Sequence, residues 1–215
     1  MAVKNDREYR DMTMEIRSAE TEDVEQEERK VVTGYASTFN EPYTLYENDD
    51  WRFDEVVDAR AFDNTDMSDV IMQYDHEGRV FARISNNTLT VTPDERGLLI
   101  EADLGGTELG RQLYEEIRGG YTNKMSFGFT VDGEDVLDTK AEDGKALTVR
   151  TITSVRKLYD VSAVSLPAND ATSISVRNLT DGEIGRIQAE RLEAEALELR
   201  RRKLLVKAKL NGGQK

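Results

Sequence analysis

The 215-residue chain contains no cysteine, a single histidine and only three prolines. The lack of cysteine excludes disulfide bonds and thiolate zinc sites, and it is compatible with a reducing cytoplasm. Because the only other strong zinc ligand is the lone His76, we expect no metal site and no other cofactor. The sequence also lacks a signal segment and any apolar run long enough to cross a bilayer, so we expect a soluble protein made in a cytoplasm.

Positive charge is scarce except near the end of the sequence. The net charge is −14, yet residues 186–215 hold nine Lys and Arg against four Asp and Glu, so the remainder carries −19. An acidic body argues against a dedicated nucleic-acid-binding protein, which needs a basic face. The basic segment could contact nucleic acid, an acidic partner or the acidic body, although a solvated charged helix is the commoner explanation. We therefore expect no specific nucleic-acid partner and no membrane partner.

Short β-branched and aromatic segments predict a mainly β fold. Strands are expected over 12–18, 31–39, 51–57, 70–74, 80–84, 88–92, 98–104, 124–131, 147–159, 161–166 and 174–176. A helix is predicted over 109–117, where a leucine or isoleucine recurs every four residues. Many short strands with one or two packed helices indicate a β-barrel or a β-sandwich of the α+β kind.

Composition divides the chain into three parts. The polar residues 1–11 are expected to be a disordered N-terminus. Residues 12–178 hold the predicted strands and form the main domain. Residues 179–215 lack proline and are rich in Glu, Arg, Ala and Leu, which predicts a helical, basic C-terminal tail.

His76 is the first candidate for chemistry, because any reaction that pairs a serine with a histidine must use it. It follows the predicted strand 70–74, where a loop can hold a side chain in a cleft. The ordinary imidazole pKa of about 6.5 suits a general base near neutral pH. Considered alone, a histidine at such a position is more often an ordinary residue of a surface turn than a catalytic base.

Ser126 lies in the segment Met-Ser-Phe-Gly-Phe, which alternates apolar and small residues. On a strand, Phe127 would point with the apolar set and Ser126 with Gly128 to the opposite face. Gly128 would leave space for a substrate backbone, and Phe127 and Gly128 are therefore predicted to line an oxyanion or substrate cleft. The alternative is an ordinary polar position on a half-exposed strand.

Asp160 is the third candidate, since a carboxylate is unusual within a β-rich run. If buried, it needs a partner, and an imidazolium would serve. The alternative is a surface residue of an edge strand.

Five segments together resemble the prohead (capsid-maturation) serine proteases of tailed bacteriophages, a family distantly similar to the herpesvirus assembly protease. The segments are 32–40, 75–76, 94–98, 125–129 and 160–169, and the resemblance covers about 12–178. It implies that Ser126 is the nucleophile, His76 the general base, and Asp160 the residue that orients the histidine. It also implies a herpesvirus-protease-like β-barrel with surrounding helices. Backbone N–H groups of the loop 119–123 are expected to stabilise the oxyanion.

The resemblance further implies a serine endopeptidase that cleaves the scaffolding segment of the major capsid protein during maturation of the prohead, and itself as well. The expected location is the inside of the procapsid in the host cytoplasm, with loss or degradation of the protease before the mature virion. A homo-oligomer would be consistent with the family. The alternative is a non-enzymatic assembly or scaffolding factor of the same fold, which would have no need of the three candidate residues.

Overall fold

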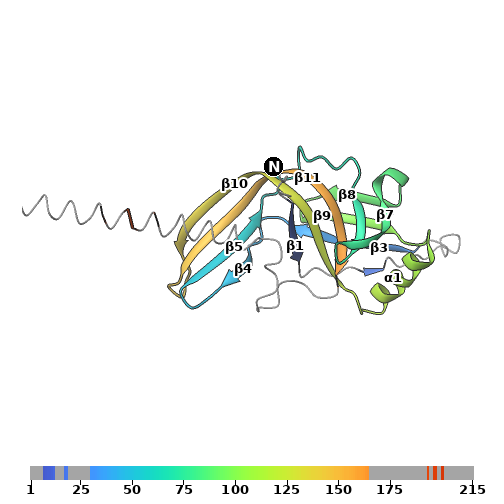
Figure 1. Cartoon of the computed structure of the whole chain (residues 1–215), viewed down its shortest axis with the longest axis horizontal. Coiled ribbons are helices and arrows are strands. Elements are labelled where there is room, and N and C mark those ends of the chain that lie inside the picture. The colour runs from blue at the N-terminus through green and yellow to red at the C-terminus, as the bar shows by residue number, and fades with distance from the viewer. Residues whose placement is uncertain are drawn as a thin grey trace, which may run out of the picture. The chain divides into compact units, whose positions relative to one another are not determined.

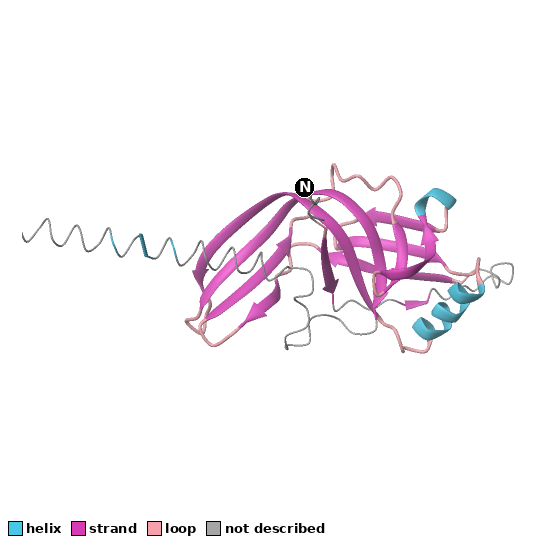
Figure 2. Cartoon of the chain, in the orientation of Figure 1, coloured by secondary structure: helices cyan, strands magenta, loops and turns pink. Residues whose placement is uncertain are grey.

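The computed structural model describes residues 7–12, 17–18, 30–164 and four positions after 190. The chain divides into two compact units, Met1–Ser175 and Val176–Lys215. All described strands lie in the first unit, in two sheets (Figures 1 and 2). None of the helices in the described residues is long and apolar enough to cross a membrane.

The first sheet is built around two long antiparallel strands. These are β10 (Lys124–Lys140) and β11 (Ala146–Val164), which run as a curved ribbon in Figure 1. β1 (Glu8–Met12) pairs with β10 at one edge, while β5 (Trp51–Val57) and β4 (Tyr43–Glu47) continue the sheet beyond β11. β6 (Ile71–Tyr74) also pairs with β11, in parallel, and β7 (Glu77–Arg83) completes a hairpin with β6. β10 and β6 therefore lie on either side of β11 near the end of the ribbon.

The second sheet has the order β2-β3-β9-β8. Its strands are β2 (Arg17–Ser18), β3 (Val31–Thr38), β9 (Gly97–Asp103) and β8 (Leu89–Pro93), and the short 3₁₀ turn η2 (Ile84–Asn86) precedes β8. The helix α1 (Glu108–Arg118) follows β9. It begins at Thr107, whose hydroxyl accepts the backbone N–H of Gly110 at 2.9 Å, as an N-cap side chain does.

One hydrophobic core joins the two sheets and the helix. Val32 and Ile100 come from the second sheet, Phe127 and Val161 from the first, and Leu113 from α1, all buried. Removing this apolar area from water is the main contribution to the stability of the fold. Because the core takes one face of β10 and β11, the opposite face of the same strands is left for polar side chains.

The β-barrel implied by the family resemblance is wrong. Barrel closure needs hydrogen bonds between the terminal strands of one sheet, whereas the described strands form two separate open sheets. The number of short strands did not distinguish these outcomes, because closure depends on pairing rather than on strand content. The surrounding helices of the α+β prediction are also wrong for the described residues, because apart from the single turn η2 one helix, α1, accompanies the two sheets within residues 30–164 and the fold is mostly β.

The two ends of the sequence differ from the expectation in different ways. Part of the segment 1–11, expected to be disordered, forms strand β1. The predicted C-terminal helical tail is not shown, because nearly all of 179–215 lies outside the described residues. Glu193, Ala196, Leu197 and Arg200 are the described positions there, and each is helical. The strand expected at 174–176 lies outside the described residues too.

Candidate active site

His76 lies in the two-residue turn between β6 and β7. Tyr74 and Glu77 pair across the hairpin, so Asp75 and His76 form its tip. Both have positive φ, 48° and 59°, as the central residues of a type I′ turn must. Asp and His are among the few residues besides glycine that adopt this conformation with some frequency. The N–H of Asp75 donates to the carbonyl of Ala163 at 3.0 Å, which ties the turn to β11.

Ser126 lies on β10 between two residues of the core. Met125 and Phe127 are fully buried, and the ring of Phe127 stacks on Phe129 with centroids 4.6 Å apart. Since side chains alternate along a strand, Ser126 and Gly128 face the other side. The side chain of Phe127 therefore lies in the core and is not brought to the hydroxyl of Ser126.

Asp160 occupies β11 directly beside this face of β10. It pairs with Gly128, and Ser162 pairs with Ser126. The carboxylate of Asp160 is fully buried, so it needs hydrogen-bond partners to offset its loss of water. Those partners include the imidazole of His76, to which it lies in direct contact.

The imidazole of His76 bridges the other two candidates. Its Nδ1 contacts Oδ1 of Asp160, and its Nε2 lies 2.5 Å from Oγ of Ser126. A carboxylate can only accept, so Nδ1 carries the proton and the neutral ring offers a lone pair at Nε2. A hydroxyl beside this lone pair can transfer its proton during attack on a carbonyl carbon, and the carboxylate then stabilises the imidazolium.

Ser162 is a second hydroxyl at the site that the sequence did not single out. Its Oγ donates to Oδ1 of Asp160 at 3.0 Å and lies 3.2 Å from Nδ1 of His76. Ser162 therefore lies beside Nδ1 of the imidazole, the nitrogen that faces Asp160, whereas Ser126 lies beside Nε2. The available signal was its spacing, since residues two apart on a strand share a face.

Gly128 provides space at the site, but the carboxylate of Asp160 and the N-terminal segment fill it. A methyl group on its Cα would collide with Oδ2 of Asp160 and would lie 2.8 Å from Cε1 of Tyr9 and 3.0 Å from Nε of Arg7. No side chain larger than hydrogen fits unless these groups move. Glycine therefore permits the close approach of Asp160, while the predicted space for a substrate backbone is occupied by residues 7–9.

Residues of β1 and Arg7, which directly precedes this strand, cover the candidate site. The guanidinium of Arg7 forms an ion pair with Asp160, and the ring of Tyr9 meets that of His76 edge-on at 4.4 Å. The carbonyl oxygen of Arg10 accepts the hydroxyl of Ser126 at 2.8 Å. Burial lowers the pKa of Arg7, although Tyr9 acts in the opposite direction. Sequence reasoning missed all three residues because the segment was expected to be disordered.

The loop 119–123 does not offer its first four N–H groups to the site. Those of Gly119 and Gly120 donate to carbonyls of α1 at 2.8 and 3.0 Å, and those of Tyr121 and Thr122 both donate to Glu116. These bonds close the C-terminal turn of the helix. An oxyanion donor from residues 119–122 would thus have to break a bond that the helix end uses.

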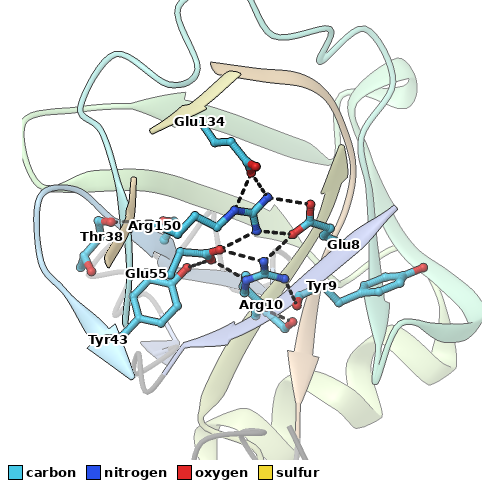
Figure 3. A network of polar contacts seen from close by, with 10 residues as sticks. Glu8, Tyr9, Arg10, Thr38, Tyr43, Glu55, Glu134 and Arg150 are labelled. Carbon is cyan, nitrogen blue, oxygen red and sulfur yellow. Dashed lines mark hydrogen bonds and ion pairs between the residues drawn. The ribbon is translucent and has the colours of Figure 1, made fainter. Parts of the chain in front are cut away.

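A second polar cluster, the ionic network, lies on the core side of β1 and β10 (Figure 3). It consists of Glu8, Arg10, Tyr43, Glu55, Glu134 and Arg150. The guanidinium of Arg10 pairs with Glu55 and Glu8, and that of Arg150 contacts Glu8 at 2.7 Å and Glu55 at 2.8 Å. No group of three or more potential metal ligands (His, Asp, Glu) that could hold an ion occurs in the parts of the chain that the structure describes.

Opposite charges favour the ionised forms of Glu8 and Arg10 in this network. Burial alone would raise the pKa of Glu8, but Arg150 and Arg10 outweigh it and lower the pKa to about 2. Burial would likewise lower the pKa of Arg10, yet Glu55 and Glu8 raise it above its ordinary value. Each charged member of the network contacts an opposite charge, and the hydroxyl of Tyr43 donates to Glu55, which is the pairing that buried ions require.

Comparison with known proteins gives one family and no individual relative. The model of the caudovirus prohead serine protease family matches residues 13–185. Comparison with curated protein sequences and with solved structures gives no significant match.

Proposed function

The chain belongs to the caudovirus prohead serine protease family, and we propose that Ser126 is its nucleophile, His76 its general base and Asp160 the residue that orients the imidazole. The observation that carries this proposal is the 2.5 Å contact between Nε2 of His76 and Oγ of Ser126, with Nδ1 of the same ring against Asp160. As a member of this family the chain is a serine peptidase of capsid maturation.

The reaction follows from the two ends of the imidazole ring. His76 takes the proton of Ser126 as Oγ bonds to the carbonyl carbon of the substrate, and Asp160 stabilises the imidazolium. The imidazolium then gives the proton to the leaving amine as the C–N bond breaks. Water, activated by the same ring, releases the acyl group and restores Ser126. Ser162 supports the step by holding the carboxylate in place at 3.0 Å.

The proposed substrate is the scaffolding segment of the major capsid protein, cut inside the procapsid, with cleavage of the protease chain itself as a second reaction. Family membership supports a capsid-protein substrate and this location. The acidic body of the chain supports a protein substrate over a nucleic acid.

The test is co-expression with the cognate capsid subunit, followed by intact-mass measurement. The wild type is expected to shorten the capsid subunit or itself, and Ser126→Ala to leave both at full length. The masses would also give the cleavage positions. Equal full-length masses in both samples, with capsids still assembled, would instead favour the non-enzymatic assembly factor.

Ser162→Ala is the matched control, because it also removes a buried hydroxyl in contact with His76. We expect this variant to retain cleavage at a reduced rate, since its hydroxyl does not lie at Nε2. If Ser162→Ala abolishes cleavage and Ser126→Ala does not, the nucleophile has been assigned to the wrong serine.

A further inference from the structure

β1 lies where an extended peptide substrate would have to lie to reach Ser126. It is the edge strand of the first sheet, antiparallel to β10, and its residues Tyr9, Arg10 and Asp11 pair with Gly128, Phe127 and Ser126. Without it, the segment of β10 that carries the nucleophile would itself be a sheet edge. A free edge binds extended peptides by adding a strand, with main-chain hydrogen bonds for affinity and alternate side chains for specificity.

In this arrangement the nucleophile is closed off. Ser126 has no exposed surface, and its hydroxyl donates to the carbonyl oxygen of Arg10. A serine hydroxyl has one proton, and Nε2 of His76 at 2.5 Å requires the same proton for catalysis. The carbonyl of Arg10 thus competes with the general base, and no incoming carbonyl can reach Oγ while β1 is in place.

The side chain of Arg7, which directly precedes β1, adds to the closure on this face. Arg7 binds the oxygen of Asp160 that His76 does not contact, so it takes part of the negative charge that an imidazolium would need. However, Nε of Arg7 is buried without a hydrogen-bond partner among the described residues. An unsatisfied buried donor carries a desolvation cost, so Arg7 is a displaceable occupant rather than a fully bonded part of the site.

The opposite face of β1 indicates what kind of substrate fits. The side chain of Arg10 is buried against Glu55, with its guanidinium carbon 5.4 Å from the centroid of the Phe129 ring. When β1 leaves, Glu55 stays buried beside Arg150 but loses its ion pair with Arg10. A basic side chain at the position of Arg10 would restore that ion pair, and an acidic one would place a second carboxylate against Glu55.

We propose that β1 is a built-in occupant of the substrate site, and that the substrate peptide replaces it as an antiparallel strand on 125–129 of β10 with a basic residue in the place of Arg10. This inference rests on the proposed function. The scissile bond is the one that follows this basic residue, because the carbonyl of Arg10 is the one at Ser126. Glu55, fully buried beneath it, is the residue that determines the specificity.

The experiment measures access to Ser126 in the full chain with a fluorophosphonate, which phosphonylates an activated serine and releases fluoride. Intact mass gives the labelling rate. Arg7→Met is expected to raise the rate roughly tenfold, the factor expected for losing one charge-assisted hydrogen bond, and Arg10→Met at least as much, because it removes the bonds to both Glu55 and Glu8. Arg83→Met is the matched control, since it removes a surface ion pair with Asp69 and should leave the rate unchanged. Ser126→Ala gives the blank.

Two peptides test the substrate chemistry on the Arg10→Met protein. One has the sequence of residues 7–12, and the other differs in carrying Glu in the place of Arg10. The first should slow labelling and the second should not, and Glu55→Gln in the protein should reduce the difference between them. If Arg10→Met does not fold, the same peptides are compared on Arg7→Met, which leaves the ionic network intact.

The outcomes separate the two proposals. Labelling of Arg7→Met and Arg10→Met at the wild-type rate overturns the inference about β1 and leaves Ser126 as the nucleophile. Equal effects of the two peptides overturn the role of Glu55. If no protein that folds is labelled, the proposed nucleophile itself is wrong.

Discussion

Two buried polar clusters lie on opposite faces of β10 and β11. They differ in the chemistry that their hydrogen bonds permit. The cluster of His76, Ser126 and Asp160 contains hydrogen bonds along which a proton can move. The ionic network around Arg150 contains carboxylates and guanidinium groups in mutual ion pairs, which lower the pKa of Glu8 to about 2 and raise the pKa of Arg150. The first can carry a proton through a reaction, whereas the second holds β1 against β5, β10 and β11 by ion pairs.

The difference teaches that burial of a polar group does not by itself identify an active site. Glu55 and Asp160 are equally inaccessible, but Glu55 is matched by two guanidinium groups and Asp160 faces an imidazole that in turn faces a hydroxyl. A functional assignment follows from the chemistry of the group that contacts the buried carboxylate, and from the chemistry of the group that this partner contacts in turn.

The largest expected effect is a loss of catalytic rate without a matching loss of protein stability, caused by a substitution at Asp160. Asp160→Asn should lower kcat/KM about 10⁴-fold, because an amide favours the wrong imidazole tautomer and cannot balance the imidazolium. The measurement is steady-state cleavage of the capsid subunit, with thermal unfolding recorded in parallel. Asp66→Asn, which alters an exposed pair with Lys157, is the control and should retain activity. A loss below tenfold would contradict the role given to Asp160.

The second cluster should respond in the opposite way. Arg150→Met leaves Glu8, Glu55 and Glu134 with one guanidinium among them, and breaking buried pairs of this kind costs about 3–5 kcal/mol of unfolding free energy. Denaturant unfolding gives the value, with the exposed Arg83→Met as the control for loss of a surface pair. A stability close to that of the wild type would show that the network is not what holds this part of the fold.

Gly128→Ala tests how strongly the catalytic rate depends on the exact position of Asp160. The added methyl group collides with the carboxylate of Asp160 and with Tyr9. Displacement of Asp160 by a few tenths of an ångström to one ångström should reduce kcat/KM about 100-fold. Gly106→Ala is the matched control, since nothing lies within 4 Å of the added carbon there. Unchanged activity of Gly128→Ala would mean that the carboxylate can shift freely.

The smallest effect is a pH dependence of the second cluster. Because the pKa of folded Glu8 is lowered to about 2 from an ordinary 4.5, its stabilising effect is complete above about pH 4.5 and is lost as the pH falls towards 2. The groups that face it are Arg10, Arg150, Glu55 and Glu134. The difference in unfolding free energy between wild type and Glu8→Gln should therefore narrow as the pH falls from 5. A constant difference would contradict this.

The central strands were predictable from the sequence because their two faces differ. The strand predicted over 31–39 is observed at Val31–Thr38, the one over 51–57 is observed without change, and the helix over 109–117 is observed at Glu108–Arg118. In each case an apolar face meets the core and produces a regular pattern. The segment around Ser126 alternates for the same reason.

β1 was not predictable, because charged and polar residues face both of its sides. Its sequence, Glu-Tyr-Arg-Asp-Met, reads as a polar terminus. Its charges find partners far along the chain, Glu8 with Arg150 and Arg10 with Glu55. No local pattern reveals such pairs, and the same holds for sheet closure, which depends on which strands meet. The covering of the candidate site therefore lay beyond sequence reasoning, although His76, Ser126 and Asp160 themselves did not.

The chain order of the site has a consequence for the time course of folding. His76 is 50 positions from Ser126 and 84 from Asp160, and the parallel pairing of β6 with β11 is needed to bring the turn to the carboxylate. Contacts between such distant segments form slowly, because the chain must close long loops first. A newly made chain would thus bring His76, Ser126 and Asp160 together only late in folding, and the contact between the imidazole and Ser126 would mark the completed pairing of β6 with β11.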